Sequence, residues 1–99
     1  MEKKKPHYLL TEIHRLIASG CWRFTHTARS GALDLGLDEA RAVTVVAELA
    51  PGAFYKSMTS HTDHQMWHDV YHTQISDGRL AYIKLTVLNG LIVVSFKEK

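Results

Sequence analysis

The spacing of apolar residues along this chain changes near residue 52, and this change constrains the fold more than any other feature. Residues 9–17 place apolar side chains three or four positions apart, the spacing of an amphipathic helix. Residues 80–88 alternate apolar and polar side chains, as a strand with one buried face does. We therefore predict an α+β fold, with N-terminal helices packed on a twisted, mainly antiparallel sheet formed by the C-terminal half.

The size of the chain predicts one domain over residues 1–99 and leaves little room for a deep enclosed site. Any chemistry is therefore expected on an open surface or in a shallow groove. The net charge of +2 permits an anionic partner without requiring one. No apolar run is long enough to span a membrane, and Cys21 is the single cysteine, so we expect a cytoplasmic protein without an intramolecular disulfide. Cys21 itself is expected to be a small buried residue.

Turn residues set the boundaries of the first predicted helix and of the strand after it. Pro6 suits a first helical turn, and Gly20 ends that helix. A short strand is expected at residues 21–25.

Two more helices are predicted before the sheet begins. Thr25 or Thr27 can cap a second helix, which Gly31 weakens and which ends near Gly36. Asp38 can cap a third helix that ends before Pro51-Gly52. The predicted buried stripe of this third helix consists of Ala40, Val43, Val46, Ala47 and Ala50.

The second half predicts strands at residues 54–59 and 66–73, followed by a hairpin. Asn89-Gly90 is a strong signal for a two-residue hairpin turn between residues 80–88 and 91–97. Such a turn places Leu88 opposite Leu91. Counting outward then predicts these cross-strand pairs: Leu85 with Val94, Lys84 with Ser95, Ile83 with Phe96, and Tyr82 with Lys97.

The predicted register gathers polar side chains on one face of the hairpin. These are Tyr82, Lys84, Ser95 and Lys97, with opposed Cβ atoms about 5 Å apart. Lysines for phosphate and a ring for stacking are what a single-stranded RNA site needs. A solvated sheet face without a function is the alternative. Tyr55-Lys56 adds a second phenol and cation at the start of the sheet half.

A row of histidines raises the question of a metal site. The row consists of His61, His64, His68 and His72, with Asp63 and Asp69 between them. On a helix these rings would lie close enough to bind zinc. The segment alternates as a strand from Met66, however, and residues four apart on a strand are about 13 Å apart. We therefore predict no metal and no cofactor, and a histidine could instead transfer a proton near neutral pH.

Several stretches resemble the MqsR family, and together they cover essentially the whole chain. The main stretch is Phe54-Tyr55-Lys56-Ser57-Met58-Thr59, followed by Asp63-His64, Trp67 and Asp69-Val70-Tyr71. Similar too are Met1-Glu2-Lys3 with Pro6-His7, Leu35-Gly36-Leu37-Asp38, and the ending at residues 92–99.

This resemblance implies a type II toxin with a fold similar to the RelE and YoeB ribonuclease toxins. It implies a sequence-selective endoribonuclease that cuts bacterial mRNA at GCU-like sites and so inhibits translation and growth. It also implies silencing by an MqsA-like antitoxin, with a zinc-binding domain and a helix-turn-helix DNA-binding domain.

The functional positions of the family fall here on Lys56, His68, Tyr82 and Lys97. Position 68 departs from the family pattern, which has glutamine there. We expect metal-free cleavage through attack of the ribose 2′-hydroxyl. In this hypothesis Lys56 stabilises charge, His68 transfers protons and Tyr82 positions the substrate or supplies an acid.

Binding of the flanking RNA is assigned to Tyr55, Lys84 and Lys97. The neighbouring Lys56 is expected to lower the pKa of His68. Two alternatives stay open: a non-catalytic RNA-binding module that uses the same patch, and a metal-dependent hydrolase built on the histidine row.

Overall fold

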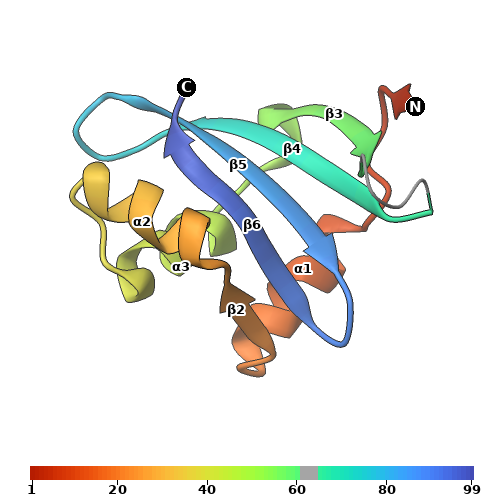
Figure 1. The fold of residues 1–99 in the computed structure, drawn as a ribbon, viewed down its shortest axis with the longest axis horizontal. Helices are drawn as coiled ribbons and strands as arrows, with labels where there is room; N and C mark the ends of the chain where they lie inside the picture. The colour runs from red at the N-terminus through yellow and green to blue at the C-terminus, as the bar shows by residue number, and fades with distance from the viewer. Residues whose placement is uncertain (61–64) are drawn as a thin grey trace.

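In the part of the chain that the structure describes, three helices cover one face of a mainly antiparallel sheet and leave the other face open. The computed structural model describes residues 1–60 and 65–99. The elements are β1 (Glu2–Lys3), α1 (Leu10–Ala18), β2 (Trp22–Phe24), α2 (His26–Asp34), α3 (Glu39–Ala47), the 3₁₀ turn η1 (Pro51–Ala53), β3 (Phe54–Thr59), β4 (Trp67–Gln74), β5 (Leu80–Val87) and β6 (Leu91–Glu98). In Figure 1, α1 and α3 lie behind the sheet. The predicted α+β fold is confirmed.

Within the described residues the strands form one six-stranded sheet in the order β1-β3-β4-β5-β6-β2. All neighbours are antiparallel except β2 and β6, which are parallel. The core lies between the sheet and the helices and includes Ile13, Leu16, Ala28, Ala32, Val43, Val46, Ile83, Leu85, Val93 and Phe96. No helix in the described part of the chain is long and apolar enough to cross a membrane.

Helix α1 begins later than its sequence predicts. Pro6 lies before the helix, so the prediction that it occupies the first turn is wrong. The segment that contains Pro6 is instead fixed to the sheet, because the backbone N–H groups of His7 and Tyr8 donate hydrogen bonds of 3.0 and 2.9 Å to the buried Asp69 carboxylate. Gly20, at a φ of +80°, follows the helix as predicted.

Helix α2 packs unusually close to β6. Thr25 caps it, since the Thr25 hydroxyl accepts a hydrogen bond from the Ala28 N–H. A Cβ atom added at Gly31 would lie only 2.0 Å from the backbone oxygen of Phe96. Gly31 therefore allows the helix and the strand to approach each other.

Helix α3 is capped by Asp38 as predicted, but its buried stripe was predicted only in part. The buried residues are Ala42, Val43, Val46 and Leu49, whereas Ala40 and Ala50 are exposed and Ala47 is half-buried. Residues 42, 46 and 49 share one helical face with 43, and this face meets the sheet. The predicted stripe, which included Ala40, Ala47 and Ala50, is therefore rotated by about one residue from the observed buried face.

The side chain of Cys21 is exposed, so the prediction of a buried cysteine is wrong. Its backbone is well bonded: the Cys21 N–H donates to the Leu16 oxygen, and the Cys21 oxygen accepts from the Leu91 N–H. These bonds join α1 to the start of β6 and leave the thiol in solvent.

The β5–β6 hairpin differs from its prediction at two places, and the two resulting shifts in register cancel each other. The turn has three residues, 88–90, so Val87 and not Leu88 lies opposite Leu91. Asn89 and Gly90 have φ values of +54° and +114°, as an Asn-Gly turn requires. A bulge then leaves Val94 without a partner on β5, and Leu85 pairs with Val93 and not with Val94.

Beyond this bulge the predicted pairs hold. Lys84 lies opposite Ser95, Ile83 opposite Phe96, and Tyr82 opposite Lys97. The two-residue turn behind that prediction is wrong, but the extra residue in the turn is offset by the extra residue in the bulge. The Val94 oxygen accepts a hydrogen bond of 2.8 Å from the Thr25 hydroxyl, which fixes the bulge against the start of α2.

Candidate functional site

Aromatic and basic side chains from four strands gather on the open face of the sheet. We call them the open-face patch, which consists of Tyr55, Lys56, His72, Tyr82, Lys84 and Lys97. Strand pairing puts them in two neighbouring rows. One row runs Lys56, Val70, Lys84 and Ser95, and the next runs His72, Tyr82 and Lys97. This open face is turned toward the viewer in Figure 1.

A bulge in β3 brings two consecutive residues to the same face. Phe54 pairs with Tyr71 and Lys56 with Val70, so Tyr55 is the extra residue between them. Side chains of a regular strand alternate between faces, whereas a bulge redirects one of them. Tyr55 therefore joins Lys56 on the open face, and its ring stacks on His72 with the centroids 4.3 Å apart.

Three rings form a continuous row across β3, β4 and β5. The Tyr55 and His72 rings are stacked at an interplanar angle of 24°, and the His72 and Tyr82 centroids are 5.7 Å apart. We call Tyr55, His72 and Tyr82 the three-ring row. It presents aromatic surface to solvent, since 48% of Tyr55 is exposed.

Lysine ammonium groups lie at both ends of this row. The Lys97 Nζ is 5.2 Å from the Tyr82 ring centroid, and the Lys56 Nζ is 5.6 Å from the Tyr55 centroid. Lys56 also donates a hydrogen bond of 2.7 Å to the carboxylate of Glu2 on β1. The arrangement combines aromatic surface in the middle with positive charge on either side.

The protonation states of these groups suit acid–base chemistry near neutral pH. The hydrogen bond that Lys56 donates to Glu2 raises the pKa of Lys56, so Lys56 stays charged. Burial raises the pKa of Tyr82, so its phenol keeps its proton. Burial, then the charges of Lys97 and Lys56, lowers the pKa of Lys84. The three lysines therefore form one mutually repelling positive cluster, which an anion would relieve.

His68 lies on β4 beside the patch, one row beyond the row that contains Lys56 and Lys84. It faces Met58 on β3, whereas Lys56 faces Val70, so the two rows are about 7 Å apart. Its pKa is lowered by burial first and by Lys84 second. The predicted direction is right, but the predicted cause, Lys56, is wrong, because the lysine that acts on the ring comes from β5. The ring is neutral at pH 7 and can accept a proton.

The structure places five of the six site residues predicted from the sequence in the open-face patch. Lys56, Tyr82, Lys84, Lys97 and Tyr55 meet there, and His68 borders it. The sequence prediction did not assign a site role to His72, which stands at the centre of the three-ring row. The β4–β5 register is the signal that identifies His72 as a site residue, because His72 lies directly opposite Tyr82.

The histidine row does not form a cluster in the described part of the chain. His61, Asp63 and His64 lie outside the described residues. His68 and His72 lie four residues apart on one strand. Among the described residues, no three His, Cys, Asp or Glu side chains come together as metal ligands would.

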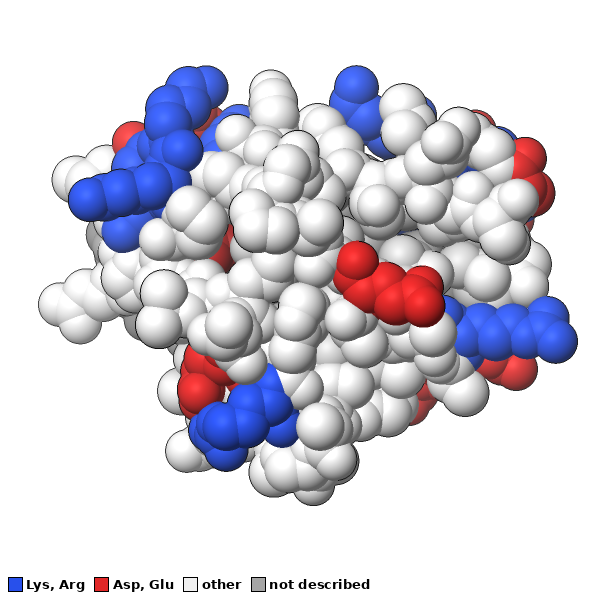
Figure 2. Space-filling model, turned by 180° about the vertical axis from the view of Figure 1, so that it is seen from behind, with Lys and Arg blue, Asp and Glu red and all other residues white. Residues whose placement is uncertain are grey.

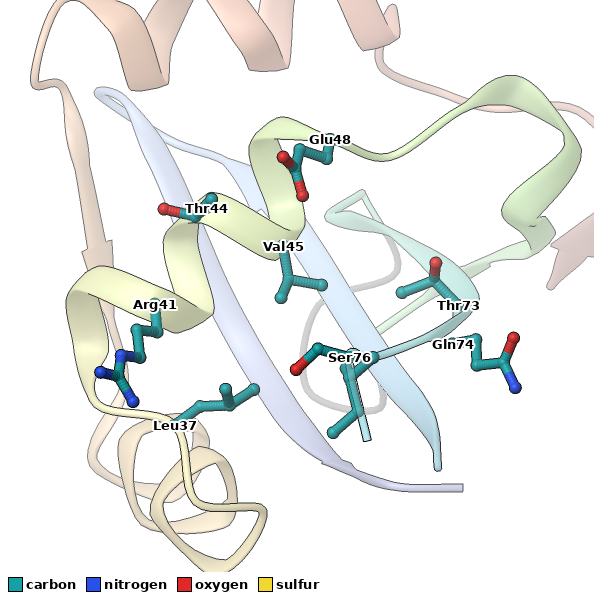
Figure 3. Close-up of a pocket in the computed structure, with 9 residues that line it drawn as sticks. Leu37, Arg41, Thr44, Val45, Glu48, Thr73, Gln74 and Ser76 are labelled. Atoms are coloured by element: carbon teal, nitrogen blue, oxygen red, sulfur yellow. The ribbon is translucent and has the colours of Figure 1, made fainter. Parts of the chain in front are cut away.

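A pocket lies elsewhere, on the helix side of the molecule. It has a volume of about 550 Å³ and lies between α3 and the end of β4. Figure 3 shows the side chains that line it, among them Arg41 and Val45 of α3 and Glu48, which follows the helix. It contains no residue of the open-face patch. On the same side, Lys and Arg side chains stand in small separate groups, several beside Asp or Glu (Figure 2).

Comparisons with known proteins agree with one another over residues 5–98. A family model described as motility quorum-sensing regulator, toxin of MqsA, matches residues 5–98. A protein of Escherichia coli (strain K12), the mRNA interferase toxin MqsR, is 41% identical over 99 residues. The match covers 100% of both chains.

Proposed function

The chain belongs to the MqsR toxin family, and from this premise we propose that it cuts single-stranded mRNA on its open-face patch without a metal ion. It is an mRNA interferase toxin, that is, an endoribonuclease. The observation that carries the proposed site is the meeting of Lys56, Tyr82, Lys84 and Lys97 beside the exposed Tyr55 ring on one face of the sheet.

In the proposed reaction the ribose 2′-hydroxyl attacks the adjacent 3′-phosphate. The 2′-oxygen–phosphorus bond forms as the bond to the 5′-oxygen of the next nucleotide breaks. His68 takes the 2′-hydroxyl proton, and Tyr82 gives a proton to the leaving oxygen or positions the phosphate. Lys56 stabilises the extra negative charge of the phosphorane. The products are a 2′,3′-cyclic phosphate and a free 5′-hydroxyl.

The pKa shifts support these roles at neutral pH. The lowered pKa of His68 leaves a neutral ring that can act as a base, and the raised pKa of Tyr82 leaves a phenol that still carries its proton. Lys84 and Lys97 would bind the phosphates on either side of the cut, and the Tyr55 ring would stack on a base. Lys56 would exchange its hydrogen bond with Glu2 for one with the phosphate.

The partner of the toxin is an antitoxin, as the family description, toxin of MqsA, indicates. We propose that this antitoxin carries a zinc-binding domain and a helix-turn-helix domain. We also propose that the toxin acts in the cytoplasm, where mRNA is translated, and that its cut sites are GCU-like.

One experiment tests the proposed chemistry. Purified protein is incubated with a naked transcript in excess chelator, and the cut positions and product ends are determined. We expect cuts at a defined short sequence, with 2′,3′-cyclic phosphate and 5′-hydroxyl ends. Loss of all cleavage in chelator would show a metal-dependent hydrolase, and binding without any cleavage would show a non-catalytic RNA-binding module.

A further inference from the structure

We propose that His72 binds a nucleobase of the substrate by stacking, as the central ring of the three-ring row. This inference rests on the proposed function and names the part of the RNA that the three-ring row binds. The ligand is an unpaired base in single-stranded RNA, because only an unpaired base can leave its own stack and lie on a protein ring.

The first argument is the position of His72 in the sheet. It lies directly opposite Tyr82, and the bulge of β3 brings Tyr55 against its other side. His72 is therefore in contact range of both tyrosines, at centroid distances of 4.3 and 5.7 Å. Without this ring, Tyr55 would lose the stacked partner that holds an exposed side chain in one orientation.

The second argument is the distribution of charge along the row. Ammonium groups lie near the outer two rings, from Lys56 at Tyr55 and from Lys97 at Tyr82. A single strand of RNA alternates negative phosphates with aromatic bases. Rings between two cations offer the matching order, with phosphates at the ends and a base in the middle.

The third argument is the state of the His72 ring itself. Burial, and then the charge of Lys99, lowers the pKa of His72. The rings of Tyr55 and Tyr82 face it from β3 and β5, and the charge that acts on it is that of Lys99. The ring is therefore neutral at pH 7 and acts between the phenols as an aromatic surface.

The test compares His72→Ala, which removes the ring, with His72→Phe, which keeps a ring without the nitrogens. The probe is a short RNA that spans a mapped cut site, with a 2′-deoxyribose at the cut to prevent cleavage and 2-aminopurine beside it to report stacking by loss of fluorescence. His26→Ala serves as a control, because His26 is an exposed histidine of α2 outside the patch. Thermal unfolding of each variant checks that it is folded.

We expect His72→Ala to bind the RNA about fivefold to tenfold more weakly, at the low end of what a lost base–aromatic stack costs, and to quench 2-aminopurine less. His72→Phe should restore binding to within about twofold of wild type, since the ring supplies the stack. With cleavable RNA, His72→Ala should raise KM by a similar factor and change kcat little.

Two results would overturn the inference while leaving the proposed function intact. One is a His72→Ala protein that binds the RNA as tightly as wild type does and quenches 2-aminopurine as strongly. The other is a His72→Phe protein as weak as His72→Ala, which would assign the effect to the ring nitrogens. A wild-type protein that neither binds nor cuts the RNA would overturn the proposed function together with this inference.

Discussion

At the scale of single residues, Lys56 is the group whose loss should affect catalysis most. We predict that Lys56→Ala lowers kcat/KM about 100-fold, because removing one group that stabilises transition-state charge costs on the order of 3 kcal/mol. Stability should change little, since the Lys56–Glu2 ion pair is partly exposed and such pairs contribute weakly. Steady-state cleavage and thermal unfolding measure the two effects. Lys5→Ala is the matched control, and near-normal cleavage by folded Lys56→Ala protein would reject the assignment.

His68 should make the activity depend on pH. A base must be deprotonated, and the pKa of His68 is lowered from the usual 6.5, so the rate should fall only when the pH drops below that value. His68→Gln should flatten this acid limb, since glutamine does not titrate. The check is a pH–rate profile of both proteins, with His26→Gln as the control. An acid limb that survives in His68→Gln would leave this residue with a binding role.

The sequence predicts which residues share the open face where residue type and register are enough. Tyr82 and Lys97 were placed together by counting along one hairpin, and Lys56 by resemblance. The stacking of Tyr55 on His72 could not be predicted, because it depends on a bulge that no turn residue signals. The influence of Lys84 on His68 depends on the β4–β5 register, which the sequence fixes less directly, because five residues, 75–79, join these two strands.

At the scale of elements, the contact between α2 and β6 depends on Gly31. Alanine in place of glycine usually stabilises a helix, but here the new methyl group would meet the Phe96 backbone oxygen at 2.0 Å. We predict that Gly31→Ala destabilises the protein by about 1–3 kcal/mol, as overpacking does. Urea denaturation measures the change, with Ser30→Ala on the exposed side as control. A Gly31→Ala protein more stable than wild type would show that α2 can move away from β6.

Helices were predicted more reliably than their packing. Caps at Thr25 and Asp38 are local features, so the sequence locates them directly. The buried face of α3 and the exposure of Cys21 depend on which side meets the sheet, and that is a property of the tertiary structure. The position of Pro6 also depends on the tertiary structure. The buried Asp69 carboxylate binds the backbone of His7 and Tyr8, so the segment that contains Pro6 stays outside α1.

At the scale of the whole molecule, the open face should bind RNA largely through its positive charge. If Lys56, Lys84 and Lys97 each neutralise one phosphate, the logarithm of the binding constant should fall with the logarithm of salt concentration with a slope of about −2. Lys84→Gln should make the slope shallower by about 0.7, whereas Lys5→Gln should leave it unchanged. Binding of the uncleavable RNA over a salt series measures this. Equal slopes for Lys84→Gln and wild type would remove Lys84 from the interface.

The two irregular positions of the β5–β6 hairpin also determine where the chain can change its length. Leu88 is the additional residue of the turn, and Val94 is the additional residue of the bulge. Loss of Leu88 would still leave Asn89-Gly90 as a tight turn with every outer pair in place, and loss of Val94 would cost mainly its bond with Thr25. Loss of a paired residue such as Leu85 would turn half of a strand over. Between Tyr82 and Lys97, insertions and deletions that arise during evolution should therefore accumulate at Leu88 and Val94, where the gene can gain or lose a codon while Tyr82 still meets Lys97.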